Sequence, residues 1–269
     1  MTSTEARRPV DVSVGRTVAR SPSRWRRVSD PVLFGIGFVI VWQIVVWIGD
    51  FHPVVLPGPG LVFGLLATKA DFLVKHMLES MKTVIAGFAL GGLFGWTAGV
   101  LINYFPRVRR AIHPILISMY VVPKAIFLPI FILWWGVEPL THKIVITTLL
   151  AFFPVTENTI AGLQGVEREM VELTQSLGGS GAFLFRKIAL PFSLPFVLAG
   201  LRIGMTESFI GTLFTEVLVP NRGIGARIAE ASDASNTHFI IAAIVVIALF
   251  GLASYFVLLV TEKRLTKWH

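Results

Sequence analysis

Long apolar runs alternate with short polar segments along this chain of 269 residues. A helix needs about 20 mostly apolar residues to cross the hydrocarbon core of a bilayer, and runs of that length recur here. The pattern predicts an all-α, polytopic membrane protein with about six transmembrane helices. We expect the spans at 32–50, 82–105, 111–136, 143–164, 192–219 and 238–261, and a partly amphipathic helix at 61–78.

Glycine and proline add detail to this pattern. Pro123 and Pro129 interrupt the third span, so we expect a kinked helix or two helical pieces there. Residues 53–60 are rich in proline and glycine and predict a loop. The second span carries small residues at a spacing that lets helix backbones approach closely in lipid. These are Gly87, Gly91, Gly92, Gly95 and Gly99.

The composition supports a membrane protein. Hydrophobic residues make up 54% of the chain and the mean hydropathy is +0.73. Charged residues make up 15%, whereas a soluble domain usually has about 25%. The chain has no cysteine, which excludes disulfides and thiolate metal sites. The six histidines lack metal-ligand spacing, and no catalytic cluster is evident, so we predict neither a metal site nor catalytic residues.

The net charge of +8 resides in clusters between the apolar runs, which favours membrane lipid over nucleic acid as its partner. We expect residues 1–31, with Arg7, Arg8, Arg16, Arg20, Arg24, Arg26 and Arg27, to be a cytosolic basic tail. The other cytosolic positions are Arg107, Arg109, Arg110, Arg168, Arg186, Lys187, Lys263, Arg264 and Lys267. The opposite side has fewer, namely Lys69, Lys75, Lys82, Lys143, Arg222 and Arg227. This asymmetry predicts that both termini are cytosolic.

One polar stretch between the fourth and fifth spans is too long for a tight turn. It reads GVEREMVELTQSLGGSGAFLFRKIALPFSLP and runs from Gly165 to Pro195. Its pattern predicts two short helices separated by Gly178-Gly179, with a stop at Pro191. A solvated connector would account for its polarity. A docking surface for a partner would also account for the amphipathic helices and the glycine break.

Within this stretch a spaced motif resembles a known family. Glu172 is followed by Leu173 and Thr174, then by Gly178 after three residues, and nine residues later by Ile188, Leu190 and Pro191. The binding-protein-dependent ABC importer permeases carry Glu-Ala-Ala, three residues, Gly, nine residues and Ile-x-Leu-Pro. Leu173 and Thr174 replace the two alanines.

Other stretches resemble the nitrate/sulfonate/taurine subfamily of these permeases, from about Leu56 onward. They are LPGPG from Leu56, GFALGGLFGWTAGVL from Gly87, PIFILWWG from Pro129, AFFPVTENTIAGL from Ala151 and LAGLRIG from Leu198. The resemblance implies a type I ABC importer permease fold. Its type-1 transmembrane core would cover 61–262, after a first transmembrane helix at 32–50 and with a cytosolic coupling loop at 165–191.

The resemblance also implies a function. The chain would be a permease subunit of the bacterial cytoplasmic membrane that translocates a small polar solute, nitrate/sulfonate/taurine-like or vitamin-precursor-like. It would work as a homodimer with two ATPase subunits and an extracytoplasmic substrate-binding protein. Glu172, Leu173, Thr174, Gly178, Ile188, Leu190 and Pro191 would couple it to the ATPase. The sequence has no G-x-x-x-x-G-K-[ST], so the chain is expected not to be an enzyme, and ATP and Mg would belong to the partner.

Ionisable residues inside predicted spans are costly and often functional. We predict a translocation path containing Lys124, Glu157, Asn158 and Glu207. Lys124 and Glu157 each follow a proline, and their opposite charges suggest either a pair or a shared polar path. Contacts at a subunit interface would account for such charges too. Glu216, near the outer end of its span, is expected to be solvated.

Two other classes share some of these features. A secondary transporter or channel would account for the hydropathy and the intramembrane charges, but not for the stretch 165–195. Such transporters often contain inverted repeats, which this sequence does not display. A membrane-embedded enzyme would require clustered catalytic residues. The substrate itself is not indicated by the sequence.

Overall fold

The computed structural model describes residues 26–136 and 140–265, and within these ranges it contains helices and connecting segments but no strand. The chain forms two structural units, which divide between Gly49 and Asp50. The first contains one described helix, α1 (Arg26–Gly49). The helices of the second are α2 (Pro59–Thr68), α3 (Ala70–Tyr104), α4 (Pro106–Val121), the 3-10 helix η1 (Lys124–Phe127), α5 (Leu128–Trp135), α6 (Thr141–Gln164), α7 (Arg168–Ser176), α8 (Gly181–Leu184), the π-helix η2 (Phe185–Ala189), α9 (Leu190–Leu218), α10 (Ile224–Asp233) and α11 (Thr237–Leu265).

Helix α1 begins inside the stretch that the sequence assigned to a polar tail. It starts at Arg26, and its apolar part from Val32 to Gly49 is long enough to cross a membrane. This stretch has the length and hydropathy expected of a segment that is surrounded by lipid. The other tail arginines, Arg7, Arg8, Arg16, Arg20 and Arg24, lie outside the described residues, as does Lys267.

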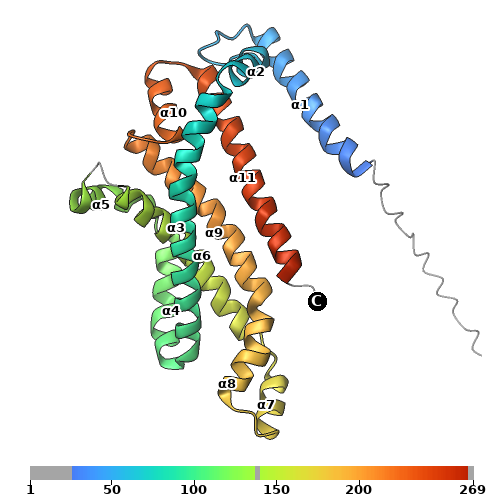
Figure 1. Ribbon diagram of the computed structural model, residues 1–269, viewed down its shortest axis with the longest axis vertical. Helices are drawn as coiled ribbons and strands as arrows, with labels where there is room; N and C mark the ends of the chain where they lie inside the picture. The colour runs from blue at the N-terminus through green and yellow to red at the C-terminus, as the bar shows by residue number, and fades with distance from the viewer. Residues whose placement is uncertain (1–25, 137–139, 266–269) are drawn as a thin grey trace, which may run out of the picture. The chain divides into compact units, whose positions relative to one another are not determined.

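The centre of the second unit is α6, which packs between α3 and α9 (Figure 1). The glycines of α3 make this contact close, as the sequence predicted. A Cβ atom at Gly91 would lie 2.6 Å from Cβ of Ala151, and one at Gly99 would lie 2.7 Å from Cβ of Thr159. Helix α9 approaches α6 in the same way, because a Cβ at Gly200 would lie 2.8 Å from Cβ of Asn158. Small residues thus form both contacts of the central helix.

The prediction of a polytopic all-α protein is confirmed. In the described part of the chain, five helices are long and apolar enough to cross a membrane. The predicted third span, 111–136, is instead divided among α4, η1 and α5. The break follows from Pro123, because the residue before a proline is disfavoured in the helical conformation. Val122 is accordingly extended, with φ −66° and ψ 128°, and α4 ends at Val121.

Helix α3 is longer than the sequence indicated. It starts at Ala70 and continues without a break to Tyr104, so it includes the end of the helix expected at 61–78 and all but the last residue of the second span. No proline lies in this helix, and its first glycine is Gly87. Nothing therefore interrupts the helix between Ala70 and the first predicted membrane residue.

The predicted stop at Pro191 is wrong. Helices α8, η2 and α9 follow one another as a single helical segment of 38 residues from Gly181 to Leu218. A proline normally clashes with the carbonyl four residues before it. Here the preceding turn is wider, because the N–H of Leu190 donates to the carbonyl of Phe185, five residues earlier. This π turn places Pro191 in the first turn of α9, where proline is tolerated.

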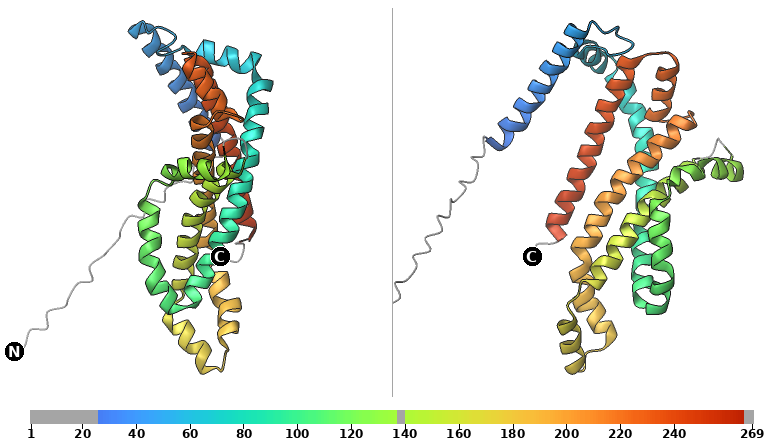
Figure 2. Two further views of the ribbon diagram at one scale, coloured as in Figure 1. Left: turned by 90° about the vertical axis from the view of Figure 1, so that its left-hand side faces the viewer. Right: turned by 180° about the vertical axis from the view of Figure 1, so that it is seen from behind.

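The two ends of the second unit differ in the elements they carry. The turn between α3 and α4 lies at the same end as α7 and α8, in Figure 1 and in both views of Figure 2. Helices α2 and α10 lie at the opposite end. The first end thus combines Arg107, Arg109 and Arg110 with the α7–α8 connector, which we define as residues 165–184 and which includes both short helices.

Candidate functional site

The α7–α8 connector has a defined backbone. The N–H of Gly178 donates to the carbonyl of Gln175 at 2.9 Å, and the N–H of Gly179 donates to that of Thr174 at 2.8 Å. Gly178 has a φ of +74°, a conformation that disfavours other residues. Ser180 then caps α8, since its hydroxyl accepts a hydrogen bond from the N–H of Phe183 at 3.2 Å. The two short helices predicted on either side of Gly178-Gly179 are therefore present.

The two glycines of this turn have different requirements. A Cβ at Gly178 would meet nothing within 4 Å, so only its backbone conformation demands glycine. A Cβ at Gly179 would lie 2.6 Å from Cγ2 of Thr174, so there the demand is steric. Thr174 is itself buried, and its hydroxyl donates to the carbonyl of Met170 at 2.8 Å. Thr174, which replaces an alanine of the family motif, thus packs directly against Gly179 in the turn.

The connector exposes a set of apolar side chains. Met170, Leu173 and Leu177 of the α7 region recur every three or four residues and are 48%, 57% and 79% exposed. Such spacing places them on one face of the helix. Phe183 on α8 is also exposed. We call Met170, Leu173, Leu177 and Phe183 the apolar face of the connector.

The remaining motif residues lie beside or beyond this face. Glu172 forms an exposed ion pair with Arg168, 2.8 Å between Oε1 and Nε. An exposed pair of this kind adds little to stability. Ile188, Leu190 and Pro191 are half-buried where η2 joins α9. The structure therefore places the motif partly on the connector and partly at the root of α9.

Lys124 and Glu157, expected as a pair or a shared path, have different partners. Glu157 Oε1 on α6 lies 3.1 Å from His113 Nε2 on α4. The Nζ of Lys124 donates to the carbonyl of Tyr120 at 3.0 Å and lies 5.1 Å from the centre of the Phe153 ring. The charge of Glu207 on α9 contributes to the electrostatic environment of Lys124. Lys124 and Glu157 thus contact different groups and do not pair with each other.

Asn158, the fourth predicted path residue, has a local role. Its Nδ2 donates to the carbonyl of Pro154 at 2.8 Å. Its Cβ lies at the close contact between α6 and Gly200 of α9. Asn158 and Glu207 are half-buried, as is Lys124. The structure therefore distributes these four residues along α6, α9 and η1 without joining them in one hydrogen-bonded network among the described residues.

A buried polar cluster at the α10 end was not predicted. The hydroxyl of Ser80 on α3 donates to Glu216 Oε2 at 2.7 Å, and the same oxygen accepts the N–H of Gly225 at 3.0 Å. Lys143 Nζ donates to Asn221 Oδ1 at 2.5 Å and to the carbonyl of Arg222 at 3.2 Å. Together these bonds fix the segment from Asn221 to Gly225 against α3, α6 and α9.

The expected solvation of Glu216 is wrong, and Lys143, counted among the charges of the non-cytosolic segments, is buried as well. Glu216 is 2% exposed and Lys143 is fully buried. The polar groups of the segment from Asn221 to Gly225 replace the water that would otherwise hydrogen-bond Glu216 and Lys143. These bonds offset the free-energy cost of burying the two side chains. The sequence contains a sign of this cluster. Glu216 lies near the end of the fifth predicted span and Lys143 begins the fourth, and two antiparallel neighbouring helices bring these positions to the same end.

Comparison with known proteins assigns the family. Residues 91–267 match the family described as "Binding-protein-dependent transport system inner membrane component". The formylaminopyrimidine transport permease protein ThiX of Halalkalibacterium halodurans is 30% identical over 89% of this chain and 95% of its own length. The taurine transport system permease protein TauC of Escherichia coli is 30% identical over 91% of this chain and 94% of its own.

Solved structures agree on the fold. An inward-facing structure of the MetNI methionine ABC transporter has a chain that superposes with a TM-score of 0.59, at 17% identity, over 74% of this chain and 97% of that one. A chain of an amino acid ABC transporter solved with histidines gives a TM-score of 0.58 at 14% identity, over 75% and 96%. The chain therefore belongs to the binding-protein-dependent transport system inner membrane components and is the membrane permease subunit of an ABC importer, with the type I permease fold.

Proposed function

We propose that this subunit imports a small polar solute across the bacterial cytoplasmic membrane and is driven by ATP hydrolysis on a separate subunit. ABC importer permeases work with ATPase and substrate-binding partners, generally as dimers. The observation that carries the proposal is the apolar face of the connector. Met170, Leu173 and Leu177 are exposed on the short polar helix α7 and its C-cap, where the chain's own core does not cover them. Exposed apolar faces of this kind are typical of surfaces that bind a protein partner.

The proposed assembly contains two copies of this chain, two ATPase subunits and an extracytoplasmic binding protein. ATP and Mg would reside on the ATPase. Glu172 and Arg168 would form the polar rim around the apolar face, since both are exposed beside it. Gly178, Gly179 and Thr174 would hold the shape of the connector, whereas Ile188, Leu190 and Pro191 would join it to α9.

The proposed orientation places both termini and the connector in the cytosol. Arg107, Arg109 and Arg110 lie at the connector end of the second unit. The last turn of α11 adds Lys263 and Arg264. Positive residues in short segments favour the cytosolic side of a membrane.

The proposed solute path includes Lys124 and Glu207, with Glu157 and Asn158 farther along α6. A lysine at membrane depth is retained at a cost, and its partial exposure leaves it able to meet a polar solute. The relatives are named for transport of formylaminopyrimidine, taurine, aliphatic sulfonates and riboflavin. A nitrate/sulfonate/taurine-like or vitamin-precursor-like solute is proposed on that basis.

The test is co-purification of the ATPase and its stimulation in proteoliposomes. Leu173→Asp places a charge in the apolar face and is expected to weaken ATPase association by about tenfold or more, because it buries an unpaired charge in the contact. Gln175→Asp adds the same charge to an exposed position on another face of α7 and is the matched control. Transport driven by an ion gradient without any ATPase would instead establish a secondary transporter or channel.

A further inference from the structure

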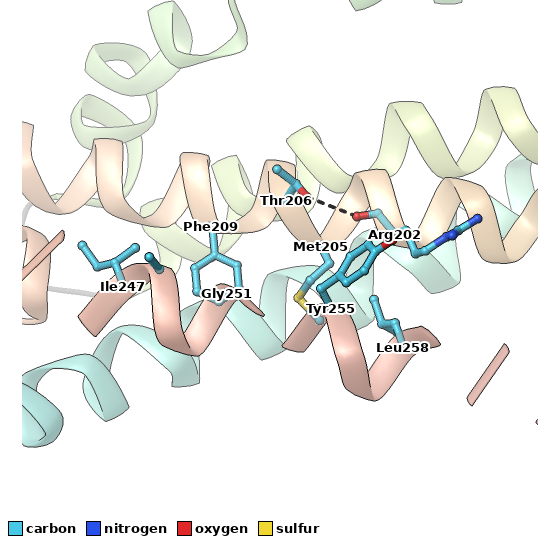
Figure 3. A pocket seen from close by; sticks show the side chains of 9 residues that line it. Arg202, Met205, Thr206, Phe209, Ile247, Gly251, Tyr255 and Leu258 are labelled. Carbon is cyan, nitrogen blue, oxygen red and sulfur yellow. Dashed lines mark hydrogen bonds between the residues drawn. The ribbon is translucent and has the colours of Figure 1, made fainter. Parts of the chain in front are cut away.

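A groove lies between α9 and α11, and none of its lining residues belongs to the connector or to the predicted path. Figure 3 shows it from Ile247 and Phe209 at one end to Leu258 and Arg202 at the other. Its volume is about 210 Å³. A second hollow of about 300 Å³ shares Arg202, Thr206 and Tyr255 with it, so the two are continuous. An apolar cavity of roughly 150 Å³ already admits a small hydrocarbon molecule.

The two ends of the groove differ in chemistry. Phe209, Ile247 and Gly251 form an apolar end, and a Cβ placed at Gly251 would meet no atom within 4 Å. Arg202 provides a guanidinium at the other end, where its side chain remains 31% exposed. The phenol of Tyr255 belongs to both hollows, near the Arg202 end in Figure 3. The groove is thus amphipathic along its length.

The guanidinium has capacity for another anion. Its Nε lies 3.5 Å from Glu262 Oε2, which is a long contact for an ion pair. Arginine carries five N–H donors, so one contact with a carboxylate leaves others for a second acceptor. Lys263 and Arg264 follow in the last turn of α11 and are exposed, which makes this end of the helix positive.

We propose that this groove binds an anionic phospholipid. One acyl chain would lie along Phe209, Ile247 and Gly251, and the phosphate would meet Arg202. Both helices are long and apolar enough to span the membrane, so lipid is the solvent at this surface. An apolar slot with a cation at one end matches an acyl chain with an anionic headgroup, and basic pockets between membrane helices bind such headgroups. The lipid would occupy the leaflet at the end where α11 finishes.

The test is native mass spectrometry of the full-length permease assembled with its partners. The protein would be released from detergent after equilibration with phosphatidylglycerol or phosphatidylcholine of identical acyl chains. The unaltered protein is expected to retain phosphatidylglycerol about tenfold better, the difference that one charge-assisted hydrogen bond makes.

Two groove variants report on the two ends. Gly251→Trp fills the open apolar end and is expected to reduce retention of both lipids. Arg202→Gln combined with Glu262→Gln keeps the charge balance and is expected to abolish the preference for phosphatidylglycerol. Leu252→Trp is the matched control, because Leu252 is the next residue on α11, is 53% exposed and does not line the groove.

Three results would overturn the inference. Equal retention of the two lipids by the unaltered protein would show that the groove does not recognise the anionic headgroup. Unchanged retention in both groove variants would place the lipid elsewhere. Loss of association between permease copies in Gly251→Trp, with lipid retention intact, would show that a second protein chain covers the groove.

Discussion

The hydroxyl of Ser80 on α3 donates a 2.7 Å hydrogen bond to the carboxylate of Glu216 on α9, across 136 positions of sequence. The same hydroxyl accepts the N–H of Ile224 at 2.8 Å. One buried oxygen atom thereby joins α3, α9 and the start of α10. The carboxylate would lose its partner from α3 if the hydroxyl were removed.

We therefore expect Ser80→Ala to destabilise the permease by about 1–3 kcal/mol, because the buried carboxylate keeps only its bond from Gly225 and the N–H of Ile224 loses its acceptor. Thermal unfolding in detergent, followed by loss of the folded monodisperse peak, measures this. Ser118→Ala is the control, since that exposed hydroxyl bonds only to Pro114 in its own helix. Equal unfolding temperatures for the two variants would contradict the prediction.

The second prediction concerns the turn at Gly178. Gly178→Val is expected to destabilise the connector by about 1–3 kcal/mol, since a β-branched residue at φ +74° is strained. Gly178→Asn should cost less, because asparagine tolerates this conformation. ATPase activity of the reconstituted complex should therefore fall in the order glycine, asparagine, valine. Both proteins should still insert into the membrane. Activity that is the same with asparagine and valine would exclude backbone strain as the reason for glycine.

The third prediction separates Lys124 and Glu207 from Glu157. Lys124→Met and Glu207→Gln are each expected to reduce transport or assembly, and the double variant should recover part of the loss, because each single change leaves one charge without its electrostatic partner. The combination of Lys124→Met with Glu157→Gln should instead be additive, since Glu157 contacts His113. The double-mutant cycle measured by solute uptake distinguishes these cases. Coupling of Lys124 to Glu157 alone would argue against the structure.

The fourth prediction concerns orientation and uses the absence of cysteine from the sequence. Ser176→Cys on the exposed connector should react with a membrane-impermeant thiol reagent only after the cells are opened. Ser232→Cys is the matched position, because it is exposed on α10 at the opposite end of the second unit. It should react in intact cells. The opposite pattern would invert the proposed topology.

The sequence predicted the features that depend on local chemistry. The apolar runs indicated the helices, and Pro123 indicated the break after α4. Gly178 and Gly179 indicated the turn of the connector. In each case the effect is local, because it depends on the conformation of the residue's own backbone or on the periodicity of its own helix. Such effects can be inferred from a single sequence.

The features that were missed depend on neighbours. Pro191 was expected to stop a helix, but the π turn before it removes the clash, and nothing in the proline itself indicates that turn. Glu216 was expected to be solvated, but the segment from Asn221 to Gly225 folds over it and over Lys143. Lys124 and Glu157 were expected as a pair or a shared path, but Glu157 contacts His113 of α4 instead.

The uninterrupted segment from Gly181 to Leu218 has a mechanical consequence. At 1.5 Å per residue, its 38 residues correspond to about 57 Å of helix. Its first turn belongs to the connector, and Glu216 stands near its last. A continuous helix transmits displacement better than a loop does, and the positions at which this one can bend are the π turn Phe185–Ala189 and Pro195. A tilt imposed at the connector should thus reach the opposite end of the segment and α10, which is bonded to it there, with bending confined to those positions.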